Sequence, residues 1–117
     1  MKSNSINSKQ YDLEDRTLKY AKDVREFVRR PSRTIINIED GKQLVRSSGS
    51  VGANYIEANE SLSKKDFIMR IKICRKEARE SEYWLSLLKT SNIEKGKLLQ
   101  ESIELRKIFG AIIEKSK

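Results

Sequence analysis

The residues best placed to do chemistry are basic side chains that recur with helical spacing. On a helix that advances about 100° per residue, five of them span an arc of about 100° that contains no carboxylate of the same helix. These residues are Lys65, Lys72, Arg75, Lys76 and Arg79. Such a face can contact the phosphates of RNA or DNA, or an acidic protein surface. Lys42 and Arg46, on a preceding helix, are candidates for additional phosphate contacts.

This basic face also has a simpler interpretation, because a solvated cationic face keeps a protein soluble. The formal net charge of +8 and the pI of about 9.7 favour a binding role. The face lacks an aromatic stacking platform, which argues against a sequence-specific reader of single strands.

A second face of the same helix carries apolar residues outside the predicted core. It consists of Ile73, Trp84 and Leu87, with Arg70 and Glu77 at its edges and Tyr83 nearer the basic residues. Because Trp, Tyr and Arg are enriched in protein interfaces, we interpret this face as a contact with another subunit or a protein partner. The alternative is a wide core stripe in which Trp84 is half-buried.

The sequence contains no catalytic or metal-binding constellation. It has no His and one Cys, which excludes a Ser-His-Asp triad, a His-containing zinc site and an internal disulfide. It also lacks a glycine-rich phosphate loop. Glu77, Glu80 and Glu82 alternate with Lys and Arg at helical spacing, so they are candidates for ion pairs, and Cys74 is interpreted as a buried core residue. We therefore expect no enzymatic activity, metal, cofactor or small-molecule substrate.

Length and composition indicate a single domain that does not enter the membrane. The chain has 117 residues, of which 37% are hydrophobic and 36% are charged. No apolar run approaches the ~18–20 residues of a membrane-spanning helix. Residues 1–10 are polar and lack the apolar stretch of a signal peptide, so we expect a cytoplasmic protein.

Four amphipathic segments provide the elements that position these side chains. Apolar residues recur at helical steps over residues 13–30, 36–59, 63–90 and 92–115, with Asp12, Ser63 and Asn92 as candidate N-caps. The third segment has the most regular heptad positions, which are Phe67, Ile71, Cys74, Ala78, Ser81, Leu85 and Leu88. In the second segment, the small residues at 46–54 are compatible with a loop, but the flanking apolar spacing favours a helix.

Short connections make consecutive helices antiparallel. We therefore predict an all-α fold, an antiparallel up-down-up-down four-helix bundle over residues 11–117. A disordered polar tail is expected at residues 1–10, since it has little apolar surface to bury.

Several segments resemble one known family. They are Arg46–Ala58, with small residues followed by Asn54-Tyr-Ile-Glu-Ala58, then Ser63-Lys-Lys-Asp-Phe67, Ile71–Ser81 and Tyr83-Trp-Leu85. They are similar to the bacterial four-helix bundle proteins, also called 23S rRNA intervening-sequence proteins, and the similarity extends from about Asp12 to Ile113. The resemblance implies a cytoplasmic bundle that forms a ring-like homopentamer and has no catalytic motif.

The resemblance also implies possible nucleic-acid partners. Some family members are encoded inside intervening sequences of 23S rRNA genes. A similar bundle is the accessory protein of diversity-generating retroelements, which binds the reverse transcriptase and offers the template RNA a basic surface. The basic face of the present chain matches that protein in charge only, not residue by residue.

The sequence supports two functional hypotheses. The first is a non-enzymatic, oligomeric bundle that binds nucleic acid or a nucleoprotein through its basic face without reading bases. The second is a protein–protein adaptor or scaffold that uses the apolar face around Trp84 and has no nucleic-acid role. A homo-oligomer is expected, with a pentamer favoured.

Overall fold

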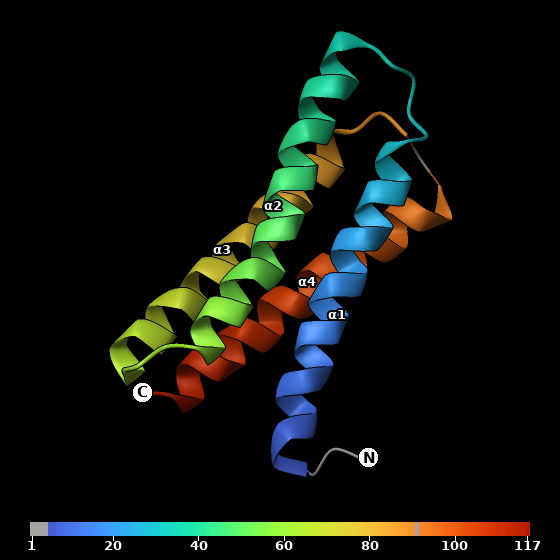
Figure 1. Cartoon of the computed structure of the whole chain (residues 1–117). Coiled ribbons are helices and arrows are strands. Elements are labelled where there is room, and N and C mark those ends of the chain that lie inside the picture. The colour runs from blue at the N-terminus through green and yellow to red at the C-terminus, as the bar shows by residue number, and fades with distance from the viewer. Residues whose placement is uncertain (1–4, 91) are drawn as a thin grey trace.

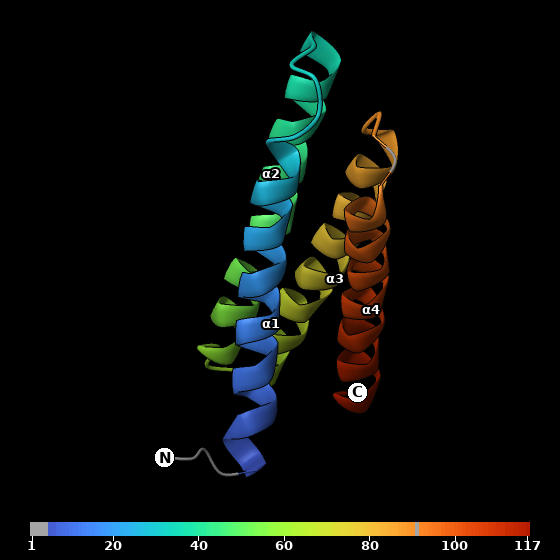
Figure 2. The same cartoon turned by 90° about the vertical axis from the view of Figure 1, so that its right-hand side faces the viewer.

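The computed structural model describes residues 5–90 and 92–117, which form four helices that run alternately up and down (Figure 1). The helices are α1 (Ser5–Val28), α2 (Ile35–Asn59), α3 (Lys64–Leu87) and α4 (Ile93–Lys115). In the turned view, α1 and α2 lie on one side and α3 and α4 on the other (Figure 2). The all-α, antiparallel four-helix bundle is confirmed. None of the helices in the described ranges combines the length and apolar content that a membrane crossing requires.

Side-chain caps determine where three of the helices begin. The side-chain oxygens of Thr34, Ser63 and Asn92 accept hydrogen bonds from backbone N–H groups three residues later, at 3.1, 3.1 and 2.8 Å. Each bond satisfies a donor that a helix leaves free at its first turn. The predicted N-caps Ser63 and Asn92 are thereby confirmed.

Helix α1 begins earlier than predicted. It starts at Ser5, so Asp12 lies within the helix and is not its N-cap. Neither Pro nor Gly occurs between residues 5 and 12, and a helix that has already formed extends through such residues at little cost. The predicted tail of residues 1–10 therefore overlaps α1 from Ser5 onward, and residues 1–4 lie outside the described part of the chain.

The small residues of the second segment form part of a continuous helix. Helix α2 passes through residues 46–54, so the predicted helix is confirmed and the loop alternative is wrong. Ser47 and Ser48 are fully buried, and Ser47 Oγ lies 2.8 Å from Ser81 Oγ on α3. Small side chains at these positions let α2 and α3 approach closely.

The heptad positions of α3 face the core, as predicted. Ile71, Cys74, Ala78, Ser81 and Leu85 are 0% exposed. Leu88 is also buried, and Phe67, near the start of α3, is half-buried. Helix α3 packs most extensively against α2 and α4, whereas α1 and α4 share the smallest helix–helix contact.

Candidate functional site

An open groove of about 490 Å³ lies between α3 and α4, and basic side chains dominate its walls. Helix α3 contributes Lys72, Arg75, Lys76 and Arg79, and helix α4 contributes Arg106, Lys107 and Gly110. Among the described residues, the groove is lined by no carboxylate. We call this feature the basic groove. Four of the five basic residues predicted on this helix thus share one wall.

Packing of the core orients the α3 wall. Ile71 and Ala78 are fully buried, while Lys72 and Arg79, the residues that follow them, are exposed. A rotation of α3 that buried these cations would expose the core residues to water. The hydrophobic effect therefore holds the basic side chains on the outside of the bundle.

The α4 wall was missed in the sequence analysis. An antiparallel hairpin with a short connection brings Gly110 opposite Arg75, and a Cβ at position 110 would lie 4.0 Å from both Arg75 Cδ and Nη1. Arg106 and Lys107 lie one turn before Gly110 and face the same groove. Arg106 and Lys107 can be assigned to the groove only from the register of α4 against α3, because basic residues do not recur at helical spacing along α4 itself.

Most of the groove cations are not paired with a carboxylate of the described residues. Arg106 Nε lies 3.3 Å from Glu82 Oε1. In the described ranges, the other five cations of the groove form no ion pair with a carboxylate. Like charges in a concave surface reinforce one another's potential, so the groove attracts anions.

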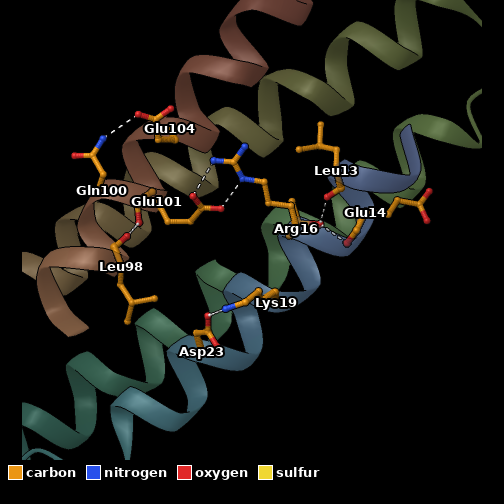
Figure 3. Close-up of polar contacts among 11 residues, drawn as sticks. Leu13, Glu14, Arg16, Lys19, Asp23, Leu98, Gln100, Glu101 and Glu104 are labelled. Atoms are coloured by element: carbon orange, nitrogen blue, oxygen red, sulfur yellow. Dashed lines mark hydrogen bonds and ion pairs between the residues drawn. The ribbon is translucent and has the colours of Figure 1, made fainter. Parts of the chain in front are cut away.

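A second groove, of about 370 Å³ between α1 and α4, has a different charge balance. Arg16 donates two hydrogen bonds to the Glu101 carboxylate, at 2.7 and 2.9 Å, and Lys19 Nζ lies 2.6 Å from Asp23 Oδ2 (Figure 3). Arg16 and Lys19 are thus satisfied by carboxylates of the same groove, and Lys97 is its one other basic residue among the described residues. The contrast makes the basic groove the better candidate for binding a polyanion.

Three predicted binding residues lie outside the basic groove. Lys65 is exposed near the start of α3 but does not line the groove. Lys42 Nζ lies 3.6 Å from Glu39, and Arg46 Nη2 lies 3.5 Å from Glu80 Oε1. Lys42 and Arg46 on α2 are therefore engaged with carboxylates and are not brought to the groove.

The predicted interface face around Trp84 is partly used within the chain, because α2 packs against it. Arg70 Nη1 donates a hydrogen bond to Asn54 Oδ1 at 3.0 Å, and Glu77 is buried near Arg46. Ile73 and Trp84 are half-buried, whereas Leu87 is 39% exposed. Arg70 and Glu77 thus fit the alternative of a wide core stripe, and Leu87 remains accessible.

Neither a metal site nor a reactive thiol is built into the described residues. No group of three or more Cys, Asp or Glu side chains in these ranges is arranged to hold a metal ion. Cys74 is fully buried, and burial raises the pKa of its thiol to about 12, which keeps it protonated. What this arrangement can do chemically is bind anions at the basic groove.

Comparisons with known proteins agree with the fold. A family model described as 23S rRNA-intervening sequence protein matches residues 9–114. The chain is also similar to the crystal structure of a protein with unknown function from the S23 ribosomal protein family of Bacteroides thetaiotaomicron. That structure aligns with a TM-score of 0.79 and 30% sequence identity, over 91% of this chain and 98% of the other. Among curated proteins, no match was found.

Proposed function

Because the chain belongs to the 23S rRNA-intervening sequence protein family, we propose that it is a non-enzymatic bundle that binds nucleic acid through its basic groove. The descriptions of the family and of the structural relative name no enzymatic activity. Within this proposal the ligand is held by its phosphates, and base edges are not read.

The observation that supports the proposal most strongly is the unneutralised charge of the groove. Two helices bring six cations to one concave surface, and only Arg106 among them is paired with a described carboxylate. Arginine guanidinium groups bind phosphate in a bidentate manner, and lysines act as point charges. Contacts of this kind position a nucleic acid but carry no sequence information.

Charge reversal tests the proposal. Lys72→Glu, Lys76→Glu and Arg79→Glu, combined in one variant, are expected to abolish binding to RNA and DNA fragments at low salt. Because all three side chains are exposed, the helical content and the stability should stay close to wild type. In the wild type, each phosphate contact should contribute about 0.9 to the slope of log K against log salt on duplex, and about 0.7 on single strands.

A matched control distinguishes the loss of the groove cations from the effect of a lower net charge. Lys22→Glu, Arg33→Glu and Lys97→Glu reverse three exposed cations that lie outside the basic groove and lower the net charge by the same amount. This control should retain most of the affinity. The proposal fails if the wild type does not bind at low salt, or if the two triple variants lose affinity equally.

The proposal includes a homo-oligomer, and the family resemblance favours a pentamer. Several copies would present several grooves to one long ligand and raise its avidity. The exposed Leu87 supports a contact between copies. Sedimentation velocity should give a wild-type particle larger than a monomer, and Leu87→Glu should shift it toward the monomer. A monomeric wild type would contradict this part of the proposal. The adaptor alternative predicts instead a partner protein and no nucleic-acid binding.

A further inference from the structure

Tyr83 is an exposed aromatic side chain that continues the basic row of α3. Positions 72, 76, 79 and 83 are separated by four, three and four residues, so they fall within an arc of about 60° on the helix. Tyr83 lies about 6 Å along the axis beyond Arg79, which is one helical turn. The tyrosine is 59% exposed and lies beyond the residues that line the basic groove, so its ring is accessible to a strand that leaves the groove along α3.

The neighbouring indole supports the tyrosine ring. The ring centroids of Tyr83 and Trp84 are 5.1 Å apart, with an interplanar angle of 73°. This edge-to-face contact is favourable for two aromatic rings. Trp84 is itself half-buried and packs against the core, so it limits where the ring of Tyr83 can go. An aromatic ring that is held in place loses less freedom when a ligand binds to it.

We propose that the basic groove together with Tyr83 binds a nucleic-acid strand that contains unpaired nucleotides. The groove cations hold the phosphates, and Tyr83 stacks on a base one turn further along α3. This inference rests on the proposed function and specifies its ligand. Sequence patterns alone indicated no stacking platform, and the exposure of Tyr83 provides a single stacking position.

The stacking step selects for an unpaired base because of the geometry of nucleic acids. In a duplex, the two faces of an internal base are covered by its neighbours, whereas an unstacked base presents a free face to an aromatic side chain. Stacking on one tyrosine tolerates any base, since every base has an aromatic face. The site therefore discriminates between single-stranded and paired regions and does not read sequence.

The experiment compares four proteins with two kinds of probe. The proteins are the wild type, Tyr83→Ala, Tyr83→Phe and Leu18→Ala, the last being a control that truncates a side chain of α1 that is 53% exposed. The probes are a short single strand and a blunt-ended duplex of equal length, each prepared as RNA and as DNA. Tyr83→Ala should weaken single-strand binding by roughly 5- to 150-fold, the range expected for one stacked base, and change duplex binding by less than about twofold. Tyr83→Phe and Leu18→Ala should bind the single strand as the wild type does.

Trp84 provides a second readout, because it is the chain's single tryptophan and touches Tyr83. Single strands should change its fluorescence, and duplexes should leave it unchanged. The inference is overturned if Tyr83→Ala weakens binding to both probes equally or to neither, while the groove triple variant still loses binding. The proposed function itself fails if the wild type binds neither probe at low salt.

Discussion

Gly52 of α2 lies so close to Thr17 of α1 that a side chain does not fit between them. A Cβ at position 52 would lie 2.9 Å from Thr17 Oγ1 and 3.2 Å from Thr17 Cβ. Thr17 is 1% exposed, and its hydroxyl donates a hydrogen bond to the Leu13 carbonyl at 2.9 Å, so it has little room to move away. The glycine weakens α2 as an isolated helix but lets α1 and α2 pack closely.

Substitution of Gly52 by alanine should show whether close packing against Thr17 outweighs the higher helix propensity of alanine. We expect Gly52→Ala to lower the free energy of unfolding by about 1–3 kcal/mol, because the added methyl group overpacks the contact with Thr17. Gly96→Ala is the matched control, since a Cβ at position 96 meets nothing within 4 Å. It should raise the free energy of unfolding by up to about 1 kcal/mol. Urea unfolding followed by circular dichroism measures both, and equal shifts in the same direction would contradict the close contact.

The core assignment of α3 leads to a second prediction. Ile71 is 0% exposed, so Ile71→Ala should leave a cavity and lower the free energy of unfolding by about 2–5 kcal/mol. Ile35→Ala, at a position that is 81% exposed, should change the free energy by less than about 0.5 kcal/mol. A loss below about 1 kcal/mol for Ile71→Ala would mean that this residue does not pack in the core as described.

The spacing of apolar residues predicted the fold because each helix of a bundle shows its own core-facing positions, whatever its neighbours are. The heptad positions from Ile71 to Leu85 could be identified without knowing their partners, and the same phase placed Lys72 and Arg79 outside. The start of α1 was harder to predict, because polar residues such as Ser5 neither favour nor stop a helix strongly enough to mark its end.

The complete groove was not predictable in this way. Arg106 and Lys107 become groove residues only through the register of α4 against α3, which depends on the connection between them. Glu77 lies at the border between the solvent-facing and core-facing sides of α3, so helical periodicity alone does not decide whether it is exposed or covered by a neighbouring helix. Glu77 is buried on the side of α3 where Arg46 of α2 lies, whereas Tyr83 is exposed in phase with Lys72 and Arg79.

Cys74 should be chemically inert in the native protein. Burial raises the pKa of its thiol to about 12, so at pH 8 its thiolate fraction is roughly 10³-fold below that of an exposed cysteine. Reaction with a disulfide reagent such as DTNB should therefore be slow in buffer and fast in denaturant. Equal rates in the two conditions would show that the thiol is accessible in the folded bundle.

Glu77 gives the bundle a pH dependence of its own. Glu77 is 7% exposed, and its Oε1 atom has no hydrogen-bond partner among the described residues; Arg46 Nη2 lies 3.9 Å away. Burial, and then the nearby Glu80, raise the pKa of Glu77, while Arg46 and Lys76 oppose the shift. The folded state therefore binds this proton more tightly than the unfolded chain does. Its contribution to stability is present at low pH and is lost as the pH rises through the interval between the unfolded pKa and the raised folded pKa.

Glu77→Gln should remove this contribution, because glutamine has nearly the same shape and does not ionise. We expect the variant to lose less stability than the wild type as the pH rises through that interval, and to be at least as stable as the wild type at neutral pH. Denaturant unfolding at a series of pH values measures the difference between the two curves. Glu57→Gln, on the exposed side of α2, serves as the control and should follow the wild-type curve. If Glu77→Gln also follows the wild-type curve, Glu77 does not contribute the expected loss of stability with rising pH. If the variant falls below the wild type at neutral pH, the ionised carboxylate of Glu77 stabilises the fold, contrary to this prediction.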